Sequence, residues 1–144
     1  LSDPIDVKLR ANLLSEMRTN GKLNSIQAVV TRASRLADKS ELPLNIYGAI
    51  EVINQELFEK DSEYKMMNVI NSLEPIATGS SRGRYSDLAN GLVAGSNVLA
   101  DFFDGDQSVM VMTDDLPVRT NRLNLLAILR NQATILADFT QISN

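Results

Sequence analysis

The stretch 120–142 constrains the fold more than any other part of this sequence. Its apolar side chains would cover about 220° of a helix circumference, whereas a helix resting on one neighbour needs only about 100°. We therefore expect a central helix that is covered on at least two sides, by its own chain or by a second copy. The apolar surface consists of Leu125, Leu126, Ile128, Leu129, Ala133, Ile135, Leu136, Ala137, Phe139 and Ile142. The polar remainder is one narrow seam of Asn124, Arg130, Asn131, Thr134, Asp138 and Gln141.

Helical periodicity also covers most of the preceding chain. Gly21, Pro43 and Pro75 are expected to end individual helices. The predicted fold class is mainly α: a single-domain bundle of five or six helices over residues 1–144, with a central C-terminal helix. The other predicted helices cover residues 2–20, 23–40, 45–60, 61–75 and 87–103.

Two segments interrupt the helical pattern. Small and turn-forming residues dominate at about 76–86, where we expect a flexible loop. An irregular acidic segment follows at about 104–117, and its apolar run 109–112 predicts at most one short strand. A lone strand edge of this kind would be able to pair with another chain.

The residue types that are missing restrict the chemistry. The 144 residues include no cysteine and no histidine, which removes disulfides, thiol chemistry, imidazole bases and His or Cys metal sites. We therefore expect a protein that is not an enzyme and holds no cofactor or metal. No apolar run approaches the roughly 20 residues of a membrane span, and the first residues do not resemble a signal peptide. A cytoplasmic protein without membrane contact is expected, and a start at Leu1 rather than Met indicates a processed chain or a piece of a longer one.

Charge is divided unevenly along the chain, whose net charge is −4. Residues 1–40 hold seven Lys or Arg against four Asp or Glu, whereas residues 41–75 hold two against seven. Residues 101–117 hold five Asp and no basic residue. Such segmentation either orients protein partners and steers acidic ligands to the N-terminal third, or reflects only the solvated face of each helix.

A basic face on the second predicted helix is the first candidate binding site. Arg32, Arg35 and Lys39 share this face at helical spacing, and Arg18 and Lys22 lie nearby in the sequence. With the short helix-turn-helix spacing, these cations would be able to contact phosphates. The sequence pI of about 4.8 and the lack of an aromatic side chain among them argue against nucleic acid.

The second candidate is the loop 79–84, whose cations are Arg82 and Arg84. Its sequence GSSRGR fails the phosphate-loop template, because the spacing is wrong and no lysine follows the second glycine. We expect either docking through the two arginines or a plain surface loop.

The third candidate is a pair of carboxylate pairs, Glu56 with Glu59 and Asp101 with Asp104. Each pair is spaced to share one helix face. If the two pairs met, they would offer the oxygen ligands that Mg²⁺ prefers.

Three functions are open at this point. The favoured one is a non-enzymatic protein–protein adaptor or assembly subunit, self-associating through helix faces, because the C-terminal helix needs more than one neighbour. One alternative is a small nucleic-acid-binding regulator that uses the first two helices. The other is a Mg²⁺-dependent nucleotide hydrolase built on the acidic pairs.

Overall fold

The computed structural model describes residues 4–141 and contains only helices and irregular segments in that range. Its α-helices are α1 (Pro4–Asn20), α2 (Lys22–Ala37), α3 (Asp61–Thr78), α4 (Arg84–Ala94), α5 (Ser96–Asp104) and α6 (Leu116–Thr134), with one short 3-10 helix, η1 (Gln55–Leu57). The predicted helical fold class is confirmed, and the run 109–112 forms no strand in this part of the chain. Within the described range, no helix has both the length and the apolar composition needed to cross a membrane.

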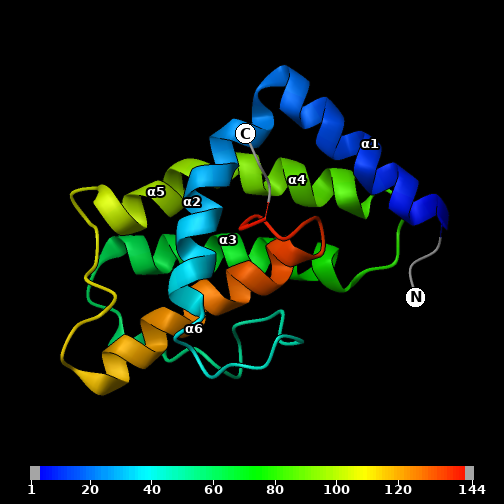
Figure 1. Ribbon diagram of the computed structural model, residues 1–144. Helices are drawn as coiled ribbons and strands as arrows, with labels where there is room; N and C mark the ends of the chain where they lie inside the picture. Colours follow the sequence, from blue (N-terminus) through cyan, green and yellow to red (C-terminus); the bar gives the residue numbers. More distant parts are fainter. Residues whose placement is uncertain (1–3, 142–144) are drawn as a thin grey trace.

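Helix α6 runs diagonally from the lower edge of the molecule towards its centre, beside α3 (Figure 1). Its most extensive contact is with α2, and it also packs against α3 and η1. Residues 125–129 have no exposed surface at all. The predicted central helix is therefore confirmed, and other segments of the same chain pack against its wide apolar surface.

The predicted helix 120–142 differs from α6 at both ends. Asp115 caps the start by accepting a hydrogen bond from the backbone N–H of Val118 (3.3 Å). After Thr134 the chain leaves the helix, and Leu136 and Phe139 pack into the core from irregular backbone, 1% and 3% exposed. The apolar pattern in this stretch marked core contacts rather than further helical turns. Ile142 lies outside the described residues.

The prediction of a helix at 45–60 is wrong. Residues 38–60 form an irregular loop interrupted only by η1, which we call the α2–α3 loop. In a helix over 45–60, Ile46, Ile50 and Ile53 would share one apolar face, but Ile50 is 88% exposed. The helical spacing of these isoleucines therefore did not outweigh Gly48 within the segment, which disfavours a helix.

Side chains of α6 hold this loop in place. The Asn131 amide donates to the carbonyls of Pro43 (3.0 Å) and Ile46 (2.9 Å). The Gln132 amide donates to the carbonyl of Tyr47 (2.8 Å). Because the loop carbonyls are satisfied by buried amides, they do not need a helical ladder of their own.

The helices flanking the predicted 76–86 loop are longer than expected. Helix α3 continues through Pro75 to Thr78, so Pro75 does not end it, and α4 begins at Arg84. The connection shortens to residues 79–83.

The predicted helix 87–103 is split at Gly95 into α4 and α5. Both helices press closely on α3. A Cβ atom at Gly91 would lie 2.4 Å from Leu73 Cδ2, and one at Gly95 would lie 3.0 Å from Val69 Cγ1. The glycines are thus needed for this close packing.

A buried ion pair ties α6 to the start of α3. The side chains of Arg122 and Glu63 are 5% and 0% exposed and meet at 3.4 Å. Glu63 also accepts hydrogen bonds from the backbone N–H groups of Glu59 and Lys60. Arg122 donates to Glu59 Oε1 (2.8 Å) and to the carbonyl of Met110 (2.8 Å), which fixes the acidic segment after α5 against the core.

Candidate functional site

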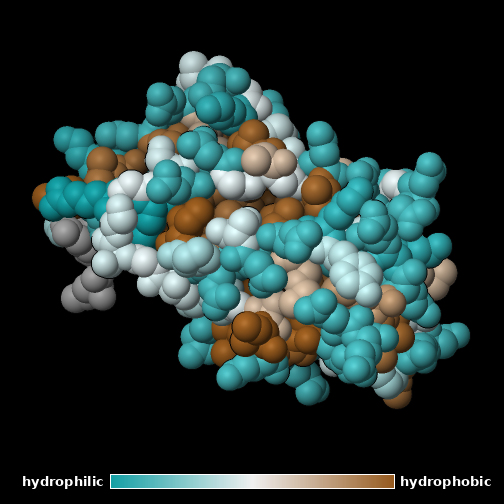
Figure 2. All heavy atoms as spheres, turned by 180° about the vertical axis from the view of Figure 1, so that it is seen from behind, coloured by the Kyte–Doolittle hydropathy of each residue, from teal (hydrophilic) through white to brown (hydrophobic). Residues whose placement is uncertain are grey.

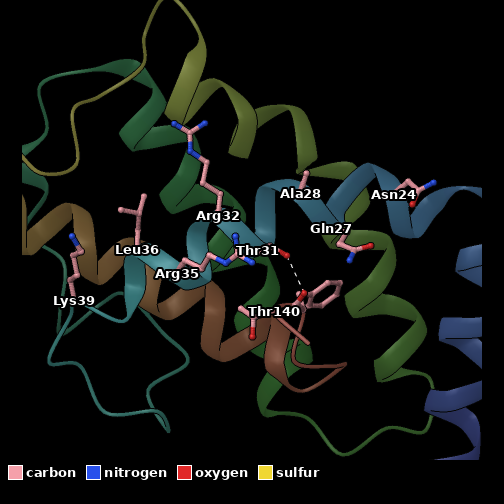
Figure 3. A pocket seen from close by; sticks show the side chains of 10 residues that line it. Asn24, Gln27, Ala28, Thr31, Arg32, Arg35, Leu36, Lys39 and Thr140 are labelled. Atoms are coloured by element: carbon pink, nitrogen blue, oxygen red, sulfur yellow. Dashed lines mark hydrogen bonds between the residues drawn. The ribbon is translucent and has the colours of Figure 1, made fainter. Parts of the chain in front are cut away.

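An open groove runs along the outer side of α2, with a volume of about 1060 Å³. The C-terminal residues 139–140 form its other wall, and the hydroxyl of Thr31 donates to the carbonyl of Phe139 (3.1 Å) across its floor (Figure 3). We call it the α2 groove. Its lining residues are Asn24, Gln27, Ala28, Thr31, Arg32, Arg35, Leu36, Lys39, Phe139 and Thr140.

Helical spacing places three cations in this groove. Ile26, Val30 and Ala33 on the opposite face of α2 have no exposed surface and pack into the core. Arg32, Arg35 and Lys39 therefore point outward as a group. The sequence-based interpretation grouped these residues as a basic face, and the structure brings them together.

Arg32 differs from its two neighbours because it has an anionic partner. Its guanidinium lies 3.1 Å from Asp104 Oδ1, with both side chains largely exposed. It also stacks over the ring of Phe103, 4.4 Å from the ring centroid. Figure 3 shows Arg32 leaving α2 in a different direction from Arg35. Arg32 thus joins α2 to the end of α5.

Arg35 and Lys39 are exposed, and neither forms an ion pair or side-chain hydrogen bond with any residue in the range 4–141. The one aromatic side chain lining the α2 groove, Phe139, is 3% exposed. The groove therefore offers cations for an anionic ligand but no free ring face for stacking a base.

A second cavity adjoins the α2 groove, and its lining includes Glu41 and a basic residue that the sequence reasoning missed. It has a volume of about 500 Å³ and lies between the start of the α2–α3 loop and α6. Lys39 lines both this cavity and the α2 groove, and Arg119 of α6 lines the second one. Arg35, Lys39 and Arg119 thus form a basic strip across two helices. Sequence distance hid Arg119, because it is 80 positions from Lys39.

The two loop arginines lie elsewhere. Arg84 donates to the carbonyl of Gly79 (2.7 Å) and to the hydroxyl of Tyr85 (3.3 Å). Arg82 is exposed. Neither residue lines the α2 groove, so the structure does not merge the two candidate binding sites.

The carboxylate pairs do not meet. Glu59 is bound to Arg122 and Asp104 to Arg32, while Glu56 is exposed in η1. Among residues 4–141, no group of three or more acidic side chains is arranged to hold a metal ion.

Comparison with known proteins gives one consistent result. No family model matches the sequence. The chain is 43% identical over 143 residues to a protein of Gloeothece citriformis named glycine–tRNA ligase beta subunit, covering 99% of the chain and 20% of that protein. Proteins with the same name are 40% identical in Acaryochloris marina, over the same shares, and 34% identical in Streptococcus thermophilus, over 96% of the chain and 18% of that protein. The chain thus spans about one fifth of the length of these relatives.

These relatives contradict two predictions made from the sequence. Proteins named as subunits of a ligase are parts of an enzyme, so the prediction of a generic, non-enzymatic and self-associating adaptor is wrong. The two alternatives, a small regulator and a nucleotide hydrolase, are not supported either. The absence of histidine and cysteine excludes their chemistry from these 144 residues alone. The chain matches about a fifth of the length of its relatives, and the catalytic groups of a longer protein need not lie in that fifth.

Proposed function

We propose that this chain is a helical part of a glycine–tRNA ligase β subunit and that its basic strip contacts the phosphate backbone of tRNA. The assignment to a β subunit rests on identity of 40–43% over 99% of the chain to proteins with that name. The proposed tRNA contact rests on the cations of the α2 groove. The polyanion is taken to be tRNA because the relatives' name includes it.

The charges of the strip suit a phosphate backbone. Arg35 and Lys39 have no anionic partner in residues 4–141, and Lys39 links the α2 groove to Arg119. Cations without internal partners release counterions from a nucleic acid on binding, which gives affinity that falls as salt rises. The overall charge of −4 does not oppose this, because a basic strip acts locally within a Debye length of about 8–10 Å.

The groove is suited to positioning rather than to reading bases. Phosphate contacts fix the register of a nucleic acid but carry no sequence information. The buried ring of Phe139 excludes base stacking within the groove. We therefore assign the strip to tRNA affinity, and not to discrimination among tRNA sequences.

The test uses the full-length β subunit assembled with the partner subunit that its name implies. We expect Arg35→Ala with Lys39→Ala to raise the KM for tRNA about tenfold, equivalent to about 1.4 kcal/mol of binding free energy. The kcat and the KM for glycine should not change. The slope of the logarithm of tRNA affinity against the logarithm of salt concentration should become shallower by about two, one for each lost cation.

Lys65→Ala is the matched control. Lys65 is an exposed lysine of α3 that pairs with Asp61, four residues earlier (3.4 Å), and its loss should not affect the KM for tRNA. An unchanged KM and salt dependence in the double variant would remove the basic strip from the tRNA interface. Absence of glycylation by the assembled full-length protein would instead overturn the assignment to the ligase.

A further inference from the structure

A second surface, on the α2–α3 loop, has the opposite chemistry to the basic strip. The loop and the C-terminal half of α3 enclose a cavity of about 350 Å³. We call it the acidic cavity. Its lining residues are Asn45, Ile46, Tyr47, Gly48, Ile50, Glu51, Val52, Glu74 and Thr78. None of them lines the α2 groove.

The loop that forms this cavity is held in one shape. The two α6 amides that bind its carbonyls belong to Asn131 and Gln132, which are 3% and 0% exposed. Gly48 packs directly on α3, where an added Cβ would lie 2.1 Å from Glu74 Oε2. Ala49 is fully buried. A loop anchored this firmly presents its outward side chains at fixed positions.

Those outward side chains are apolar. Ile50 is 88% exposed and Leu44 is 71% exposed, and both belong to the anchored part of the loop. Figure 2 shows, on the face seen from behind, hydrophobic patches among mainly hydrophilic side chains. Exposed aliphatic side chains on a rigid loop gain no folding energy, and grouped apolar surface of this kind marks interaction sites.

The charges beside the apolar side chains are negative. Glu51 is exposed and Glu74 is half-buried, and neither has an ion-pair partner among the described residues. This surface would repel a nucleic acid and attract a cationic protein surface.

We propose that the acidic cavity docks a positively charged protein segment of the ligase assembly that lies outside these 144 residues. A Lys or Arg of that segment places its charged end towards Glu51 and Glu74, and an adjacent apolar side chain covers Ile50. The choice of partner rests on the proposed function, because the relatives named as β subunits are about five times longer than this chain. The chemistry of the surface, apolar with acidic flanks, rests on the structure alone.

The experiment places the photoreactive residue p-benzoylphenylalanine at position 50 of the full-length β subunit in the assembled ligase. Irradiation should couple it to a peptide outside residues 1–144 that contains Lys or Arg, identified by mass spectrometry. The same residue at position 68 is the matched control, because Asn68 is exposed on α3 and does not line the cavity. Position 68 should give no adduct.

A second variant tests the charge. We expect Glu51→Lys to reduce the yield of the position-50 adduct about tenfold, since a like charge opposite a docked cation is repelled. Glu51→Gln should reduce it less. An equal yield for Glu51, Lys and Gln would overturn the cationic assignment.

Other outcomes overturn the proposal directly. These are no adduct at position 50, an adduct with tRNA, and an adduct within residues 1–144 of another copy. Position 50 is separate from the basic strip. If the docking proposal fails, the expected effect of the Arg35 and Lys39 substitutions on the KM for tRNA is therefore unaffected. Failure of the tRNA proposal would likewise leave the adduct in place.

Discussion

Arginines on two adjacent helices of this protein have opposite environments. Arg122 of α6 is 5% exposed and binds Glu63, Glu59 and the carbonyl of Met110. Arg35 of α2 is exposed and has no ion-pair partner within residues 4–141. Arg122 organises irregular segments of the chain itself, whereas Arg35 is available to a ligand. The same type of side chain therefore stabilises the fold in α6 and is left exposed in α2.

The largest expected effect is the loss of Arg122. Arg122→Met leaves Glu63 charged and fully buried without its guanidinium, and breaking a buried pair in this way costs about 3–5 kcal/mol. The free energy of unfolding from urea titration measures the loss. Arg35→Met, the same change on α2, is the control and should cost less than about 0.5 kcal/mol. Equal effects for the two variants would erase the contrast between the helices.

A smaller effect is expected at Asn131. Asn131→Ala removes both hydrogen bonds to the α2–α3 loop and leaves two carbonyls without a donor, at a cost of about 2 kcal/mol. Amide hydrogen exchange of residues 43–52 should become faster in this variant. Asn71→Ala, an exposed asparagine of α3, should change neither stability nor exchange. Unaltered exchange in the Asn131 variant would mean that the loop is held by other contacts.

On α2 the largest expected effect on stability is at Thr31. Thr31→Val removes the hydrogen bond to the carbonyl of Phe139 across the α2 groove, which should cost about 1 kcal/mol. Thr78→Val is the control, because the Thr78 hydroxyl is exposed and donates to the carbonyl of Glu74 in its own helix. Thermal or urea unfolding distinguishes the two. If Thr31→Val is as stable as the unaltered protein, the groove floor does not depend on this contact.

The smallest expected effect on stability is at the basic strip. Arg35→Ala with Lys39→Ala should alter the free energy of unfolding by no more than about 0.5 kcal/mol, because both side chains are exposed and have no ion-pair partner among residues 4–141. This variant is also the one expected to weaken tRNA binding. A stability loss above about 1 kcal/mol would show that these residues belong to the fold, as Arg122 does.

The cations of the candidate site were recognisable from sequence in part. Arg32 and Arg35 lie on one regular helix, and Lys39 follows two residues after its end, so their common side follows from the helical period. Arg119 was not recognisable, because its proximity to Lys39 depends on how α6 crosses the end of α2. That Arg32 is engaged by Asp104 also depends on tertiary packing, since α5 and α2 are far apart in the chain.

Local patterns were sufficient for most of the helices and for the buried position of α6. Its apolar girth exceeded what one neighbour covers, and burial of that surface dominates the folding free energy. Local patterns failed for residues 45–60, where the helical spacing of isoleucines was misleading. There the conformation depends on buried amides of α6, including Asn121, which exchanges two hydrogen bonds with the backbone of Asn54 (2.8 and 2.9 Å).

Local patterns succeeded for the helices and failed for the α2–α3 loop for one physical reason. Helical periodicity and charge spacing are properties of neighbouring residues, so they follow from the amino-acid order. The partners of a buried polar group are chosen by packing, because any donor or acceptor withdrawn from water must find one wherever the fold supplies it. For this chain, order in the sequence accounts for the bundle and the basic face of α2, and packing accounts for the anchored loop, the Arg122 network and the acidic cavity.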